Sequence, residues 1–239
     1  MSVATPRHAH TGRAIWSITV ALAVVALACP GLVLAEAVLS APPANPDPDR
    51  YHLVYLHGAI VEGSDGRPVS PDYGPYEYAA IVDRFLDSGF VTLSEIRPNN
   101  TDVERYATKV VSWIGQLLAA GVPAGRITIV GASKGGVIAS LVSHQLQNEK
   151  IKYVILAGLF ATVAAQHDLE LHGEVLSIHD EADKFQVTPE AFFERSEGLA
   201  NSKSLVTRTG LGHGLLYQAH PEWFDATVAW SGIGSHPDR

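Results

Sequence analysis

The sequence predicts a mostly parallel six-stranded sheet with helices on both faces. Six short apolar runs alternate with helical patterns along the chain, and several of these runs are followed directly by glycine or polar residues. Short continuous apolar strands that alternate with helices are typical of parallel sheets buried on both faces. In such sheets the ligand crevice lies at the carboxyl ends of the strands, so the residues after each strand are the first candidates for a functional site.

The predicted strands are apolar runs rich in Val, Ile, Leu and aromatic residues. In chain order they cover residues 51–56, 90–96, 126–130, 152–157, 174–178 and 204–207. The predicted helices show apolar residues at intervals of three or four. They cover residues 76–86, 103–120, 136–146, 189–195 and 221–230. Right-handed crossovers between successive parallel strands follow from the usual handedness of this connection.

Composition and charge restrict the class of protein. The chain has 239 residues, of which 46% are hydrophobic and 18% are charged, so one well-buried domain and a leader segment fit its length. The formal net charge of −8 argues against a nucleic-acid partner. The single cysteine, Cys29, lies within the leader, so the rest of the chain can form neither an intrachain disulfide nor a thiolate metal site.

The first 35 residues resemble a targeting segment. Arg7 and Arg13 precede an apolar run over residues 14–34, and small residues at Ala35 and Ala37 are compatible with cleavage near Glu36. The run is also just long enough to cross a bilayer. We therefore expect either a signal peptide that is removed on export to the periplasm or medium, or an N-terminal membrane anchor; membrane contact is expected only through this segment.

The remaining chain is expected to form one domain with short flanking segments. Four prolines between residues 40 and 49 predict that residues 36–50 are an extended linker. The domain is expected over residues 51–232, and residues 233–239 are a C-terminal tail. The sequence does not indicate the oligomeric state.

One motif between the third strand and the next helix indicates chemistry. The segment Gly131-Ala132-Ser133-Lys134-Gly135 fits the pattern G-x-S-x-G of a nucleophile elbow. Such a turn forces the serine into a strained backbone conformation, and its small neighbours let other backbone segments approach closely. The hydroxyl of Ser133 is then presented at the carboxyl end of a strand and at a helix N-terminus, which favours developing negative charge.

An acid and a histidine follow the two last strands. Asp183 lies shortly after the fifth strand and His213, flanked by two glycines, follows the sixth. His213 is the candidate general base for Ser133, because a free serine hydroxyl is a poor nucleophile. Asp183 is the favoured acid to orient the imidazole, and Asp180 and Glu181 are the alternatives.

Other residues after the strands are candidates for binding and positioning. The backbone N–H groups of Ala59 and Lys134 are the predicted donors of an oxyanion hole, and the Lys134 side chain is expected to lie at the surface or at the helix start rather than to be catalytic. The candidate crevice residues are His57, Gly58, Glu62, Glu95 and Arg97. For the three charged members of this set, a buried ion pair that braces loops is favoured over contact with a substrate.

Taken together, these motifs resemble the α/β-hydrolase superfamily. The resemblance is carried by His57-Gly58, the Ser133 motif, the Asp183 segment and Gly212-His213-Gly214. It implies a serine hydrolase that forms an acyl-enzyme intermediate on a small-molecule acyl substrate, as in carboxylesterases and lipases. Thioesters and amides are alternative substrates. The chain looks like a compact form, without the first two strands of the full fold and without room for a large cap between residues 152 and 174.

The same residues disfavour some alternative functions and leave one open. A phosphate-binding loop is disfavoured because no Gly-Lys-Ser/Thr follows the Ser133 motif, and a nicotinamide cofactor because no G-x-G-x-x-G follows the first strand. The acids near Asp183 lack a second ligand cluster, so we expect neither a metal nor a cofactor. A catalytically silent binding or scaffold protein of the cell envelope is the alternative from a different functional class.

Overall fold

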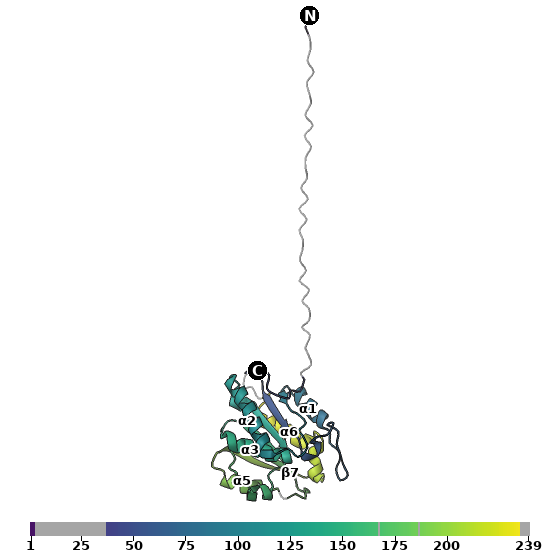
Figure 1. The fold of residues 1–239 in the computed structure, drawn as a ribbon, viewed down its shortest axis with the longest axis vertical. Helices are drawn as coiled ribbons and strands as arrows, with labels where there is room; N and C mark the ends of the chain where they lie inside the picture. The colour runs from purple at the N-terminus through teal and green to yellow at the C-terminus, as the bar shows by residue number, and fades with distance from the viewer. Residues whose placement is uncertain (3–36, 167, 186, 235–239) are drawn as a thin grey trace. The chain divides into compact units, whose positions relative to one another are not determined.

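A computed structural model describes residues 1–2, 37–166, 168–185 and 187–234 (Figure 1). The predicted leader from residue 3 onward, its cleavage site and most of the predicted tail lie outside the described residues. The described residues from 37 to 234 form one compact unit. Within the described part of the chain, no helix has both the length and the apolar character needed to cross a membrane.

The central sheet has six parallel strands, as the sequence predicts. They are β1 (His52–Leu56), β4 (Val91–Leu93), β5 (Ile127–Ala132), β6 (Lys152–Leu156), β7 (Gly173–Asp180) and β8 (Leu199–Thr207), in the spatial order β4-β1-β5-β6-β7-β8. The chain places β4 on one side of β1 and β5 on the other. The direction of winding therefore reverses between β1 and β5, which is where a crevice forms in open α/β sheets.

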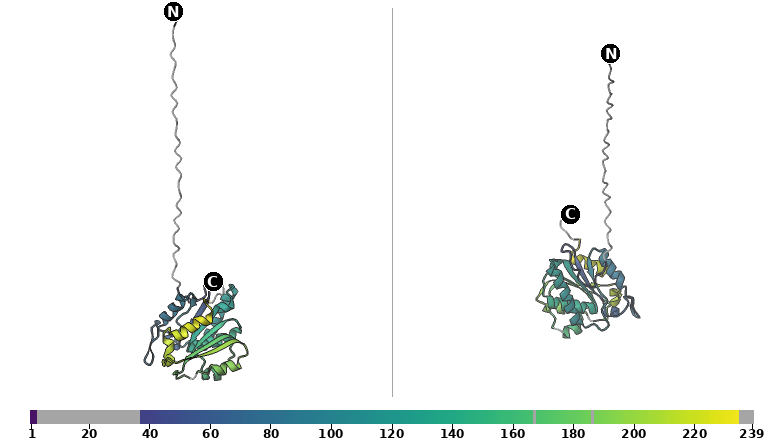
Figure 2. Two further views of the ribbon diagram at one scale, coloured as in Figure 1. Left: turned by 180° about the vertical axis from the view of Figure 1, so that it is seen from behind. Right: turned by 45° about the horizontal axis from the view of Figure 1, so that its top comes forward.

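Helices cover both faces of this sheet (Figure 1 and Figure 2). On one face lie α2 (Val103–Ala119), α3 (Lys134–Leu146) and α5 (Pro189–Arg195), and on the other lie α1 (Tyr78–Asp87) and α6 (Pro221–Ser231). Alternate residues of β1 serve the two faces, because successive side chains of a strand point in opposite directions. Val54 packs into the core beneath α2 and α3, and Leu53 packs into the core beneath α1 and α6.

The helix boundaries follow from capping and amphipathic pattern. Asp102 caps α2 by accepting a hydrogen bond from the N–H of Arg105 at 2.8 Å, which satisfies one of the free donors of the first turn. The apolar stripe of α1 buries Ile81, Val82 and Phe85.

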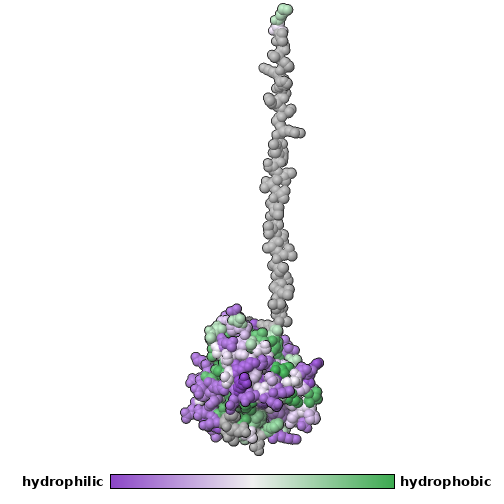
Figure 3. All heavy atoms as spheres, viewed as in Figure 1, coloured by the Kyte–Doolittle hydropathy of each residue, from purple (hydrophilic) through white to green (hydrophobic). Residues whose placement is uncertain are grey.

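On the face seen in Figure 3, hydrophilic side chains surround small hydrophobic patches, as expected for a domain whose apolar residues are buried in two cores.

Some elements differ from the sequence prediction. The antiparallel ribbon of β2 (Val69–Ser70) and β3 (Gly74–Pro75) was not predicted, since these strands are too short to show a period. The helix α4 (Ala161–Gln166) lies between residues 152 and 174, where the sequence leaves room only for a short loop or helix. The strand β8 begins at Leu199 rather than at residue 204. Its first half was missed because it is polar and exposed at the edge of the sheet, where no apolar run marks a strand.

Residues 37–50, predicted as a linker, contact the domain instead of extending away from it. The N–H of Leu39 donates to the carbonyl of Thr92 at 3.0 Å, and the N–H of Ser94 donates to the carbonyl of Leu39 at 2.8 Å. Arg126 also donates to the carbonyl of Pro48 at 3.0 Å. The edge strand β4 has backbone groups that need hydrogen-bond partners, and the segment around Leu39 supplies them.

Candidate active site

Ser133 lies in a strained turn between β5 and α3. Its backbone angles are φ 53° and ψ −116°, a combination that residues other than glycine rarely adopt. The turn is held from both sides: the N–H of Ser133 donates to the carbonyl of Leu156 at 2.8 Å, and its own carbonyl accepts from Gly136 and Val137. The hydroxyl is therefore fixed at the carboxyl end of the sheet, as the motif predicts.

The glycines of the motif allow three backbone segments to meet. A Cβ atom on Gly135 would lie 1.9 Å from the carbonyl oxygen of Leu56, and one on Gly131 would lie 2.3 Å from the carbonyl oxygen of Gly135. Real Cβ atoms do not approach this closely. Only glycine at these positions lets β1, β5 and the first turn of α3 pack against one another, which confirms the expected close approach.

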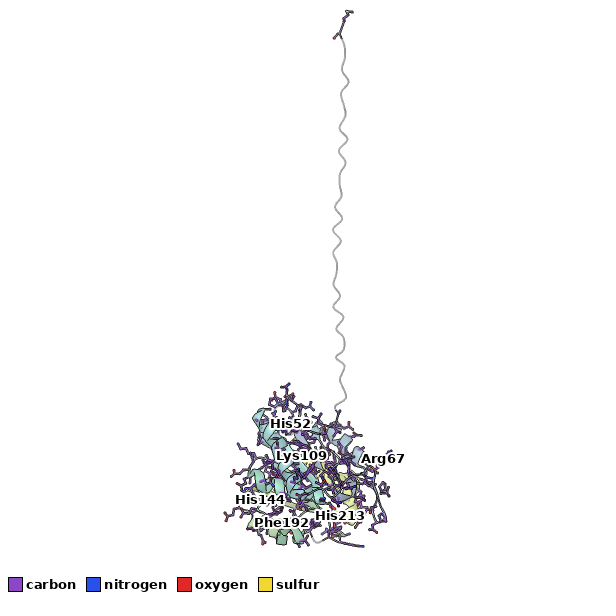
Figure 4. The ribbon with its side chains drawn as sticks, in the orientation of Figure 1. His52, Arg67, Lys109, His144, Phe192 and His213 are labelled. Atoms are coloured by element: carbon purple, nitrogen blue, oxygen red, sulfur yellow. The ribbon has the colours of Figure 1, made fainter. Side chains whose placement is uncertain are left out.

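The structure brings Ser133, His213 and Asp183 together. Nε2 of His213 lies 3.0 Å from Oγ of Ser133, and Nδ1 of His213 lies 2.8 Å from Oδ2 of Asp183. His213, labelled in Figure 4, belongs to the 3-10 helix Gly212–Tyr217, and it is buried. Three separate loops thus form one hydrogen-bonded chain in which the imidazole bridges a hydroxyl and a carboxylate.

Asp183 is held in place by its own loop. Its second oxygen, Oδ1, accepts a hydrogen bond from the N–H of Phe185 at 2.9 Å, and its N–H donates to the carbonyl of Asp180 at 3.0 Å. Its side chain is 1% exposed. The carboxylate therefore presents Oδ2 to His213 in a single orientation.

Asp180 has a different role, although it lies only three residues away. Burial alone would raise the pKa of its carboxyl, but hydrogen bonds from Thr209, Ala182 and Thr207 outweigh this effect and hold the pKa below its ordinary value. The carboxylate accepts hydrogen bonds from the N–H groups of Ala182, Thr209 and Gly212 and from the hydroxyls of Thr207 and Thr209. Asp180 thus ties the ends of β7 and β8 to the loop that carries His213.

Glu181, the third candidate acid, faces solvent. Its carboxylate forms an exposed ion pair with Arg208, with Nε and Oε2 3.0 Å apart. Of the three acids considered, only Asp183 has a hydrogen bond to His213 among the described residues.

The two predicted oxyanion donors lie beside Ser133. A Cβ atom placed on Gly58 would be 3.7 Å from Cβ of Ser133, so the turn that starts at Ala59 begins next to the serine. Lys134 is the first residue of α3, where N–H groups have no partner within the helix. Within the described part of the chain, no hydrogen bond involves the backbone N–H of Ala59 or of Lys134.

The candidate crevice residues divide into two groups. Glu62 and Arg97 form a buried ion pair, with Oε1 and Nε 3.3 Å apart, and Arg97 also donates to the carbonyl of His57. Glu95 faces α2 instead, where it accepts from the hydroxyl of Tyr106 at 2.9 Å and pairs with Lys109. The charged residues therefore brace loops, which is the role that the sequence favoured for them.

Lys134 completes the buried pair into a cluster. Its Nζ lies 2.9 Å from Oε2 of Glu62, and its side chain is 23% exposed. Lys134 lies at the start of α3, one of the two places expected for it, but its contact with Glu62 was not predicted. The two residues are 72 positions apart in the chain, so no local pattern could pair them.

His57 is held as a neutral imidazole. Its Nδ1 lies 2.8 Å from the carbonyl oxygen of Gly58, and its Nε2 accepts the N–H of Arg97 at 3.0 Å, so one neutral tautomer satisfies both contacts. Burial and then the charge of Arg97 lower the pKa of His57 from 6.5 to about 3.

We expect this neutral imidazole to make the fold sensitive to acid. The pKa of His57 is lower in the folded than in the unfolded chain, so its stabilising contribution is full above pH 6.5 and is lost as the pH falls towards 3. In an NMR titration, the ring signals of His57 should stay those of the neutral form down to about pH 4. A midpoint near 6.5 would contradict this expectation. His57→Gln should weaken the pH dependence of the free energy of unfolding between pH 6.5 and 4.

An open cleft of about 560 Å³ lies beside Ser133. Its lining residues are Ser133, Lys134, Val137, Phe160, Ala161, Thr162, Lys184 and Phe185. The ring of Phe185 is 51% exposed and lies 4.4 Å from the imidazole of His213, and the ring of Phe160 lies 5.9 Å from that of Phe185. Neither phenylalanine was predicted to line the site. For Phe185 the sequence offered one signal, an aromatic residue two positions after Asp183 in a polar stretch.

The ring of Tyr73 also lies near His213, 6.2 Å from the imidazole. Tyr73 is in the turn that joins β2 and β3, so this unpredicted ribbon also borders the site. Within the described part of the chain, no group of three or more His, Cys, Asp and Glu residues is placed to hold a metal ion.

Comparison with known proteins gives similarity at the level of structure. No protein-family model matches the sequence, and no curated protein matches it. Among solved structures, esterase PE8 is 19% identical with a TM-score of 0.54, and the match covers 81% of this chain and 97% of that one. The chain has the α/β-hydrolase fold. SOBER1 from Arabidopsis thaliana is 16% identical with a TM-score of 0.51, covering 76% of this chain and 97% of that one.

Est1E from Butyrivibrio proteoclasticus, solved with ferulic acid bound, is 15% identical with a TM-score of 0.51, and the match covers 78% of this chain and 90% of that one. These chains are matched over nearly their whole length, so the resemblance is to a complete domain of the α/β-hydrolase fold. In this chain the fold has six parallel strands, and the short helix α4 lies between β6 and β7 where a cap would be inserted.

Proposed function

We propose that this protein is a serine hydrolase that cleaves a carboxylic ester through an acyl-enzyme intermediate. The observation that carries the proposal is the hydrogen-bonded chain from Ser133 through His213 to Asp183. The strained turn at Ser133 supports the same chemistry, as do the backbone N–H groups of Ala59 and Lys134, which have no hydrogen-bond partner among the described residues. Esterase PE8, which shares the fold, is a protein named for such an activity.

The geometry suits a two-step reaction. Oγ of Ser133 attacks the ester carbonyl carbon while its proton moves to Nε2 of His213, and the N–H groups of Ala59 and Lys134 bind the developing oxyanion. The bond to the alcohol oxygen then breaks, and His213 returns the proton to this oxygen. Asp183 holds the imidazole in the required tautomer and stabilises its protonated form. His213 next takes a proton from a water molecule, whose oxygen attacks the acyl carbon. The bond between this carbon and Oγ of Ser133 then breaks, His213 returns the proton to Oγ, and the acid is released.

The cleft indicates the kind of ester. Phe160, Phe185 and Val137 give it apolar walls, and it is open to solvent. A substrate with one apolar group of modest size would bury this group against the phenylalanines, while its ester carbonyl reaches Ser133. We expect such esters to be met outside the cytoplasm, because the leader over residues 1–35 is expected to direct export or membrane anchoring.

We expect a fluorophosphonate probe to label the folded protein at Ser133. Ser133→Ala should abolish labelling and ester hydrolysis. Among the described residues, only Ser133 combines the strained turn with a hydrogen bond to His213. Ser112→Ala, at an exposed position on α2, is the matched control and should label normally. The measurement is in-gel fluorescence with p-nitrophenyl acetate turnover. Equal labelling of Ser133→Ala, or no labelling of the folded wild-type protein, would show the proposal to be wrong.

A further inference from the structure

We infer that the side chains of Glu62 and Lys134 are positioning residues that hold the two predicted oxyanion donors in a fixed arrangement. The inference rests on the proposed function. Lys134 carries one donor on its backbone, and its Nζ lies 2.9 Å from Oε2 of Glu62. Glu62 ends the turn that begins at the other donor residue, Ala59, and its N–H donates to the carbonyl of Ala59 at 3.0 Å.

The turn from His57 to Glu62 is anchored from below by Arg97. Arg97 contacts it at three points: its Nε pairs with Oε1 of Glu62, its guanidinium donates to the carbonyl of His57, and its backbone N–H donates to the ring of His57. The ring of His57 in turn contacts the carbonyl of Gly58 at 2.8 Å. Because the carbonyl and the N–H of a trans peptide point in opposite directions, fixing the Gly58 carbonyl also fixes the direction of the Ala59 N–H.

The Glu62–Lys134 pair then connects this anchored turn to the nucleophile elbow. The two segments come from different strands, β1 and β5, and the ion pair joins them at their ends, where strand pairing has stopped. Positioning of this kind matters because a displacement of about 1 Å in a catalytic group can cost about 10²-fold in rate. The Lys134 side chain is flexible, but its Nζ is paired with Glu62, and Arg97 in turn holds the carboxylate of Glu62. These contacts limit the displacement of the two N–H donors.

Burial strengthens the attraction between the charges of Glu62 and Arg97 within this cluster. The side chain of Glu62 is 5% exposed and that of Arg97 is 1% exposed, so solvent screens their charges weakly. The side chain of Lys134 is partly exposed, at 23%. One carboxylate faces two cations here, so these three side chains together retain a single positive charge. Glu95, the next acid, is already paired with Lys109.

A cluster that acts on the oxyanion donors should affect kcat rather than KM, because the oxyanion exists only after attack. We expect Lys134→Met to lower kcat for p-nitrophenyl acetate about tenfold with KM nearly unchanged, and to slow fluorophosphonate labelling by a similar factor; complete loss of one donor costs about 10²–10³-fold. Lys134→Met keeps the backbone N–H and the length of the stem. Lys134→Arg should restore most of the rate, because it restores the ion pair.

A double variant tests whether Glu62 and Lys134 act through one shared contact or through two independent effects. Glu62→Gln with Lys134→Met should lower kcat no further than the more impaired single variant, since both remove the same contact. Lys109→Met is the matched control: it removes an ion pair of α2 that lies apart from His213 (Figure 4) and should leave kcat unchanged. Thermal melting of each variant shows that it is folded; Lys134→Met should be, because its side chain is partly exposed.

Three results would overturn the inference. Unchanged kcat in Lys134→Met, a rise in KM with constant kcat, or additive losses in the double variant would each show that the pair does not position the donors. If one of these results is found and the wild-type protein is still labelled at Ser133, the inference fails but the proposed hydrolase function stands. Absence of that labelling in the wild-type protein contradicts the proposed function itself, and the inference fails with it.

Discussion

Asp183→Asn is expected to lower kcat for p-nitrophenyl acetate by about 10⁴-fold while the protein stays folded. The amide oxygen can still accept the N–H of Phe185, but an amide NH₂ facing His213 would favour the tautomer that cannot take the proton of Ser133. Steady-state hydrolysis and fluorophosphonate labelling should fall together, and the near-ultraviolet circular dichroism of the variant should match the wild-type spectrum.

The two neighbouring acids supply the controls for this result. Glu181→Gln removes only an exposed ion pair and should leave kcat and stability unchanged. Asp180→Asn should lower the melting temperature clearly, because the carboxylate accepts several hydrogen bonds that an amide cannot all satisfy. If Asp180→Asn melted normally and lost as much activity as Asp183→Asn is expected to lose, Asp180 would be the orienting acid.

Gly135→Ala is expected to prevent the native fold. The added Cβ would lie 1.9 Å from the carbonyl oxygen of Leu56, which belongs to a central strand and pairs with Gly131 of β5. Neither backbone can retreat without breaking the sheet, so we expect a loss above about 4 kcal/mol in the free energy of unfolding, the range of severe core defects. The gain of about 1 kcal/mol in helix propensity cannot offset it. Urea denaturation, or loss of soluble protein, measures the effect.

Gly115→Ala is the matched control on α2. No atom lies within 4 Å of the position where its Cβ would be, and the helix interior favours alanine over glycine by about 1 kcal/mol. This variant should therefore be as stable as the wild-type protein or more stable. If Gly135→Ala were as stable as Gly115→Ala, the close approach of β1 to α3 would not be a requirement of the fold.

The order of apolar runs was enough to predict the sheet, because each buried parallel strand needs a continuous apolar stretch of its own. The elbow at Ser133 was predictable for a local reason: its glycines are neighbours in the chain. The acid was not resolved, because Asp180, Glu181 and Asp183 differ only in the path of one loop. That path depends on hydrogen bonds to Thr209 and Gly212, which are distant in the sequence. The Glu62–Lys134 contact was missed for the same reason.

The backbone and the side chain of Phe185 have different roles. Its backbone N–H holds Asp183, and its ring borders the cleft over His213. Every amino acid except proline keeps the N–H, so the side chain at this position is free to change without loosening the acid. Substrate preference can therefore drift in evolution, or be redesigned, at a point that touches the catalytic chain but does not carry its chemistry.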